Sequence, residues 1–166
     1  KTHWKTFLRH MRRISKKLGC DNARVKLFIS DAGRGITTHV PVVFDDYRFL
    51  IDYYHASQHI SKFLKKLGEK RKAVIKEWRD QLTSLLYKGQ IKELVRRMQD
   101  LRCGKKNKIL QREIAYFEKH EPYFDFANFR RHKWNIGSGS IESACRWLIQ
   151  QRFKLSGMRW KLPGFN

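Results

Sequence analysis

The chain has 166 residues, of which 41% are hydrophobic and 13% aromatic, which suffices for about one folded domain with a buried core. Its 37 Lys and Arg against 15 Asp and Glu give a formal net charge of +22. No apolar run approaches the roughly 18 to 20 residues of a bilayer span, and the three cysteines form no CxxC pair. We therefore expect neither a membrane protein nor a secreted disulfide scaffold, but a cytoplasmic protein with an anionic partner, above all nucleic acid.

The chain opens on a helical pattern. Apolar residues spaced by three and four predict a helix from Trp4 to Leu18, and Gly19 is a plausible stop. A β-rich apolar run from Val25 then predicts a buried strand that ends at Asp31.

The next segment is ambiguous, because Pro41 disfavours both a helix and a central strand over 36–44. A second short strand is predicted over 47–55, with Asp52 near its end. Two strands that are linked by about 20 residues and that each end in an acid favour a parallel α/β arrangement. Ligands of open α/β sheets collect at the carboxyl ends of the strands.

The middle of the chain changes to helical periodicity. Each of four segments has an apolar stripe and a polar face rich in Lys and Arg, and Gly68, Gly89 and Gly104 separate them. The four predicted helices cover 57–67, 69–86, 91–101 and 108–119. Their simplest interpretation is a packed helical subdomain with a solvated basic face, which is also able to lie along a phosphate backbone.

A Gly/Ser loop over 136–140 leads into the last predicted helix, with Glu142 in its first turn. Carboxylates from Asp31, Asp52 and Glu142 converge if this helix packs on the sheet, and such oxygen ligands suit Mg²⁺ or Mn²⁺. The residues alone leave simpler alternatives open. Glu142 can complement the helix dipole or pair with Arg146, and Asp31 can be an ordinary turn residue.

Four sequence motifs give more specific information about function. Ile29-Ser30-Asp31-Ala32-Gly33, Asp52-Tyr53-Tyr54-His55, Ile136-Gly137-Ser138-Gly139-Ser140-Ile141-Glu142-Ser143-Ala144-Cys145 and Ser156-Gly157-Met158-Arg159-Trp160 occur in this order. Together they resemble the DDE-type transposases of bacterial insertion sequences, in particular the ISKra-like group, which is related in plan to Mutator-like transposases. The resemblance covers about Val25 to Trp160.

This resemblance implies an α/β, RNase H-like catalytic core that is dominated by helices, with Mg²⁺- or Mn²⁺-dependent DNA cleavage and strand transfer. Asp31 and Glu142 match catalytic, metal-binding acids of the family, and Asp52 and His55 match an Asp-x-x-His motif that supports the active site. For His55, a purely structural role between strand and helix is an equal alternative. The implied division is a partial core over 1–55, a helical insertion over 56–131, and the glutamate helix with its tail over 132–166.

One family feature is missing from the sequence. The family's first catalytic aspartate lies on an earlier strand, and the 52 − 31 = 21 residues between Asp31 and Asp52 cannot hold the strands that separate the first two acids. Asp31 therefore corresponds to the second acid. We expect a transposase fragment that lacks the first sheet strands and is inactive alone.

Basic residues around the predicted glutamate helix are the expected phosphate contacts. They are Arg130, Arg131, Lys133, Arg146, Arg152, Lys154 and Arg159. The implied partners are DNA, as element ends and target, and further copies of the chain in a nucleoid-associated assembly.

Four alternatives remain open. The chain is also interpretable as a non-catalytic nucleic-acid-binding module or inactive relic, or as an unrelated basic helical protein. His55 and His59 have a zinc-compatible i, i+4 spacing, but no general-base glutamate intervenes. Trp134, Trp147 and Trp160 are candidates for stacking an unpaired base, with core packing favoured for Trp147.

Overall fold

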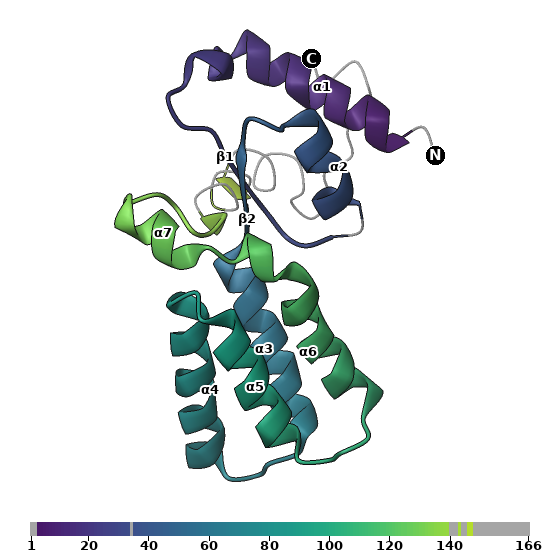
Figure 1. The fold of residues 1–166 in the computed structure, drawn as a ribbon, viewed down its shortest axis with the longest axis vertical. Coiled ribbons are helices and arrows are strands. Elements are labelled where there is room, and N and C mark those ends of the chain that lie inside the picture. Colours follow the sequence, from purple (N-terminus) through teal and green to yellow (C-terminus); the bar gives the residue numbers. More distant parts are fainter. Residues whose placement is uncertain (1–2, 34, 140–142, 144–145, 148–166) are drawn as a thin grey trace.

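A computed structural model describes residues 3–33, 35–139, 143 and 146–147 as a mostly helical chain around a small parallel sheet (Figure 1). The elements are α1 (His3–Lys17), the 3₁₀ helix η1 (Cys20–Asn22), β1 (Leu27–Ser30), α2 (Ile36–Val43), β2 (Arg48–Ile51), α3 (Tyr53–Leu67), α4 (Lys72–Tyr87), α5 (Ile91–Arg102), α6 (Lys108–His120), the 3₁₀ helix η2 (Glu121–Tyr123) and α7 (Phe126–Arg131). None of the helices in these ranges has the length and apolar character that crossing a bilayer requires.

The two strands pair in parallel, as the sequence predicts. Leu27 is in register with Arg48, and Ser30 with Ile51. The helix α2 connects them, as parallel pairing requires. The residues that follow the strands therefore lie side by side at one edge of the sheet.

One local expectation needs correction, and one open question is resolved. The second strand does not extend over 47–55, because Asp52 begins a helix at Tyr53 by accepting the backbone NH of His55 at 2.8 Å. The ambiguous segment 36–44 is helical. Pro41 is tolerated there because α2 ends only two residues later, so that few helical hydrogen bonds follow the missing NH.

Helices α3 to α6 form a helical unit on one side of the sheet, with α3 packed against α4 and α6 (Figure 1). The four predicted helices are confirmed, and Gly68 ends α3 with a φ of 80°. The implied boundary between residues 55 and 56 falls inside α3. This helix follows β2 directly and is also part of the helical unit. One core joins the two parts; its fully buried large side chains include Leu50, Ile51, Phe63, Leu82, Leu94, Phe117 and Phe126.

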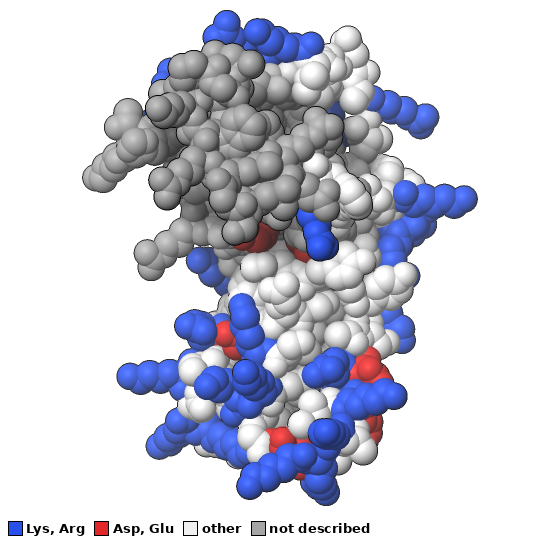
Figure 2. All heavy atoms as spheres, turned by 180° about the vertical axis from the view of Figure 1, so that it is seen from behind, with Lys and Arg blue, Asp and Glu red and all other residues white. Residues whose placement is uncertain are grey.

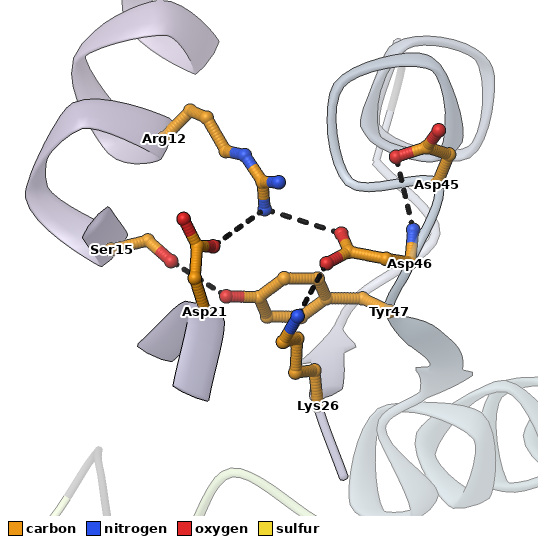
Figure 3. Close-up of polar contacts among 7 residues, drawn as sticks. All are labelled: Arg12, Ser15, Asp21, Lys26, Asp45, Asp46 and Tyr47. Atoms are coloured by element: carbon orange, nitrogen blue, oxygen red, sulfur yellow. Dashed lines mark hydrogen bonds and ion pairs between the residues drawn. The ribbon is translucent and has the colours of Figure 1, made fainter. Parts of the chain in front are cut away.

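Helices α1 and α2 cover the other side of the sheet with a smaller core built on Leu8, Val40 and Phe44. A polar cluster fastens α1 to the turn before β2 (Figure 3). Asp46 lies 3.2 Å from Arg12 and 2.6 Å from Lys26, which precedes β1. The predicted N-terminal helix is thereby placed against both strands.

Candidate active site

Asp31 and Asp52 follow β1 and β2 directly, and the parallel register places them at the same edge of the sheet. The NH of Asp52 donates to the carbonyl of Ser30 at 2.8 Å, which extends the ladder by one step. Both aspartates line a pocket of about 410 Å³, which we call the carboxyl-edge pocket. The described residues around it are Ile29, Ser30, Asp31, Asp52, Tyr54, His55, Gln58 and Ser138.

Asp52 is the organising residue of this pocket. Its side chain is buried, with the residue 4% exposed. Oδ1 caps α3 through the NH of His55, and Oδ2 accepts the NH of Ser138 at 2.5 Å and its hydroxyl at 2.8 Å. Burial by itself would raise the pKa of Asp52, but the hydrogen bonds from Ser138 and His55 outweigh it and lower the pKa below its ordinary value.

These bonds bring the Gly/Ser loop to the sheet. The NH of Tyr53 also donates to the carbonyl of Ile136 at 2.9 Å, so the loop is fixed on both sides of Gly137. A Cβ at Gly137 would lie 2.8 Å from two ring atoms of Tyr54. With the Tyr54 ring in this position, only glycine fits here without a shift of that ring. Three of the sequence motifs thus meet in one pocket.

Asp31 is more exposed than Asp52 and accepts fewer hydrogen bonds from the described residues. It is exposed, and the hydrogen bond given to its carboxylate within the described residues comes from the NH of Gly33 at 3.1 Å. Burial raises the pKa of Tyr116 well above its ordinary value, and the negative charges of Asp31, Glu113 and Asp52 add to this rise. Among the described residues, Asp31 therefore presents an exposed carboxylate to the pocket, whereas the oxygens of Asp52 are occupied by hydrogen bonds.

His55 and His59 lie one turn apart on α3 with ring centroids 5.2 Å apart. His55 lines the pocket. His59 instead bonds Glu113 on α6, Nδ1 to Oε2 at 2.5 Å, and stacks on Tyr116 at 3.7 Å. Glu113 is 1% exposed. Neither Glu113 nor Tyr116 is predicted from the sequence, although an acid on the buried face of α6 indicates a buried partner.

The pairing of His59 bears on the zinc alternative. Burial lowers the pKa of His59 below its ordinary value, against the opposing pull of Glu113. The neutral imidazole therefore donates its Nδ1 proton to the Glu113 carboxylate. No group of three His, Cys, Asp or Glu side chains in the described ranges is arranged to hold a metal ion.

The predicted catalytic Glu142 lies outside the described residues, as do the predicted DNA contacts Arg152, Lys154 and Arg159. Among the other predicted contacts, Arg131, Lys133 and Arg146 are exposed. Arg130 is half-buried, with its guanidinium 3.8 Å from the centre of the Tyr87 ring, so it is at least partly a packing residue.

Core packing was the expectation for Trp147, and it is wrong. The side chain is 64% exposed and belongs to neither of the two described cores. Trp134, by contrast, packs against the main core.

The donor chemistry fits a hard divalent cation at Asp31 rather than at Asp52. An exposed carboxylate with free lone pairs is the ligand that Mg²⁺ prefers, and Asp52 already uses its oxygens on three NH or OH groups. Asp52 thus acts on the pocket by fixing α3 and the loop. Comparison with protein-family models, with curated proteins and with solved structures finds no match for this chain.

Proposed function

We propose that this chain carries part of the RNase H-like catalytic core of a DDE-type transposase, which cuts DNA and joins the cut end to a target. The observation that supports the proposal best is the meeting of three separate motifs in the carboxyl-edge pocket. Asp31, Asp52 and Ser138 come from distant parts of the sequence and line one hollow. Glu142 follows Ser138 by only four positions.

In this proposal each described residue has a distinct task. Asp31 provides an open carboxylate for a divalent cation, with Glu142 as the second ligand. Asp52 holds the Gly/Ser loop against α3, and thereby sets where the segment leading to Glu142 starts. His55 faces the pocket, where it orients a substrate phosphate or a neighbouring carboxylate. When bound, Mg²⁺ would supply electrophilic activation of the phosphodiester.

The surface charge supports DNA as the partner. Lys and Arg are spread over the helical unit, as Figure 2 shows from the back of the molecule. Three of these lysines, Lys62, Lys65 and Lys66, are exposed on α3, which starts in the pocket. A duplex that lies along the helical unit would therefore extend toward the candidate site. Its phosphates would be neutralised by these lysines, which releases counterions from the DNA.

A cation-binding experiment tests the proposed chemistry. Manganese is titrated into the chain and free Mn²⁺ is followed by its EPR signal. We expect one Mn²⁺ site that Asp31→Asn and Glu142→Gln both abolish. Asp45→Asn removes an exposed aspartate of the turn before β2 and serves as the matched control, which should leave the site intact. If Mn²⁺ still binds to each of the two single variants, the proposed metal pair is excluded.

A DNA-binding experiment tests the partner. We expect affinity for a labelled duplex to fall with salt, with a log–log slope reduced by about 0.9 for each phosphate contact removed. Replacing Lys62, Lys65 and Lys66 together by Gln should flatten this slope, whereas Asp31→Asn should not. A slope that the triple replacement leaves unchanged would mean that this face of α3 does not contact the phosphates.

The second candidate function is a non-catalytic nucleic-acid-binding module. It is favoured by the net charge of +22, which nucleic-acid binding explains without any chemistry. The two experiments separate the candidates. Duplex binding without a Mn²⁺ site at Asp31 would support the module, and both together would support the transposase core.

A further inference from the structure

A second pocket lies at the opposite edge of the sheet, where the strands begin; we call it the amino-edge pocket. Its volume is about 540 Å³, within the range of about 300–1,000 Å³ that is usual for small-molecule sites. The described residues that line it are Arg24, Val25, Arg48, His132 and Trp134. Because β1 and β2 run in the same direction, this pocket and the carboxyl-edge pocket lie at opposite ends of the strands.

The lining is cationic, and none of the described lining residues is acidic. Arg24 and Arg48 are exposed, and no carboxylate of the described residues pairs with either one. Some arginines elsewhere are neutralised, for example Arg12 by Asp46 and Arg96 by Glu93. Two unpaired guanidinium groups beside one hollow favour an anion there, and their planar donor forks match phosphate.

The pocket also offers an aromatic surface. The ring of Trp134 carries the guanidinium of Arg48 at 4.9 Å, and the imidazole of His132 stacks on it at 4.5 Å with the planes 20° apart. Arg48 and His132 are both exposed, but the His132 ring is hydrogen-bonded to the carbonyl of Asn128 at 2.9 Å, so Arg48 is the group that a base would displace from the indole. The indole thus already holds flat, electron-poor or aromatic groups, which is the way it would hold a nucleobase.

The turn after α7 and a contact with Phe129 fix the position of Trp134. The NH of Trp134 donates to the carbonyl of Phe129 at 2.9 Å, and the NH of Lys133 donates to that of Arg130 at 2.9 Å. Lys133 has a φ of 58°, so the chain closes α7 in the manner of a Schellman motif. The edge-on contact of Phe129 with Trp134 at 5.4 Å completes it. A site whose aromatic platform is preorganised loses little entropy on binding.

We propose that the amino-edge pocket binds one nucleotide unit of single-stranded nucleic acid, with the base stacked on Trp134 and the phosphate held by Arg24 and Arg48. A duplex does not provide such a unit, because its bases are stacked on each other. The proposal shares with the proposed function the nucleic-acid partner only, and it is independent of the chemistry at Asp31.

The test compares two labelled oligonucleotides of equal length and charge, six thymidylates and six abasic units, by fluorescence anisotropy. We expect the wild-type chain to bind the thymidylate strand about tenfold more tightly, the effect of stacking one base. Trp134→Ala should remove this preference, and Trp134→Phe should keep most of it. Trp4→Ala, which removes an exposed tryptophan of α1, is the matched control and should leave the preference unchanged.

The phosphate part has its own arm. Replacing Arg24 and Arg48 together by Gln should weaken both strands about tenfold or more, and leave their ratio near the wild-type value. Replacing Arg9 and Arg79, two exposed arginines outside the pocket, should weaken both by about twofold through net charge alone. Equal losses in the two double variants would overturn the assignment of the phosphate.

Free nucleotides are distinguished from a strand by competition. Thymidine monophosphate at the same nucleotide concentration should not displace the thymidylate strand, and equal displacement would overturn the single-strand assignment. A wild-type chain without preference for bases, or a preference that survives in Trp134→Ala, would overturn the stacking site.

Asp31→Asn should leave the preference for bases unchanged. This separates the amino-edge pocket from the proposed function. If no Mn²⁺ site is found but the preference for bases is, only the proposed transposase chemistry is wrong. If the Mn²⁺ site is found but the preference for bases is not, only the proposed nucleotide site in the amino-edge pocket is wrong.

Discussion

Ser138 binds one carboxylate oxygen of Asp52 twice, through its backbone NH and through its hydroxyl. The two residues are 86 positions apart, and the helical unit lies between them in the sequence. A single buried carboxylate therefore joins the start of α3 to the Gly/Ser loop. The geometry of the candidate site depends on this joint as much as on the residues that would bind a cation.

Asp52→Asn should destabilise the chain by about 2 kcal/mol at neutral pH. The amide keeps the volume but presents an NH₂ group to one of the donors, which leaves a buried donor unpaired, and hydrogen bonds to charged groups contribute about 1.5–3 kcal/mol. Urea unfolding followed by circular dichroism measures the loss. Ser138→Ala removes only the hydroxyl bond and should cost about 1 kcal/mol.

The same pair predicts a pH dependence. The pKa of Asp52 is lower in the folded chain than its ordinary value of 3.8. Its stabilising effect is therefore fully present above about pH 4 and is lost as the pH falls through the folded pKa. The difference in stability between wild type and Asp52→Asn should shrink in that acidic window. A difference that stays constant down to pH 2.5 would contradict the role of the ionised carboxylate.

Gly137→Ala should destabilise the chain by about 1–2 kcal/mol, because the added Cβ would lie 2.8 Å from the ring of Tyr54. Tyr54 is 62% exposed, so its ring is the group that must move. The cost should nearly vanish in a Tyr54→Ala background. A double-mutant cycle by urea unfolding measures this coupling, and additive effects would mean that the loop backbone itself, rather than the ring, rejects the methyl group.

The pair of His59 and Glu113 should respond asymmetrically to substitution. His59→Ala leaves the buried Glu113 carboxylate with only Arg112, whose guanidinium is 3.1 Å from Oε1 and largely exposed. We expect a loss of about 3 kcal/mol or more, because a buried charge is left poorly compensated. Glu113→Gln keeps the shape and buries no charge, so it should cost about 1 kcal/mol. Equal losses would contradict an ionised Glu113.

The buried histidines predict a second pH window. Burial lowers the pKa of both His59 and His120 below the ordinary value of 6.5. Below that value the unfolded chain takes up protons that the folded chain refuses, so stability should fall as the pH drops from 7 toward 5. Replacing both histidines by Gln should reduce this loss, as measured by urea unfolding across the range. His10→Gln on exposed α1 is the control and should not.

Lys133→Gly should stabilise the chain by about 1 kcal/mol. Its φ of 58° lies in the left-handed region, which costs roughly 1–2 kcal/mol for a residue with a Cβ and little for glycine. Lys133→Ala removes the same charge but keeps the Cβ, and it should show no such gain. Thermal unfolding of the two variants measures the difference, and equal stabilities would mean that the turn after α7 relaxes.

Much of the fold follows from local sequence patterns. The apolar spacing over 57–119 predicts the four helices, since packing on one stripe requires it, and each of Gly68, Gly89 and Gly104 follows a helix in the structure with a positive φ. The two apolar runs that end at Asp31 and Asp52 predict the parallel pair. These features are encoded within a few residues of where they occur.

Other features depend on distant partners and escape such patterns. Residues 53–55 have strand-like composition, but the Asp52 cap makes them helical. Glu113 is buried with one carboxylate oxygen bonded by His59 on another helix and the other by Arg112. The amino-edge pocket needs Arg24, Arg48 and Trp134 from three segments. The proposed roles of Asp31 and Glu142 remain predictions for the cation experiment to test.

The helix α3 runs without a break from the carboxyl-edge pocket into the helical unit. Its 15 residues span about 22 Å at 1.5 Å per residue, with Asp52 fixed at one end and, at the other, the carbonyl of Leu67 held by Lys105 at 2.8 Å. A continuous helix that is fixed at both ends has no flexible linker between the pocket and the far end of the helical unit. Because α3 lines the pocket with Tyr54, His55 and Gln58 and packs against α4 and α6, a shift of those helices would move this wall of the pocket with them.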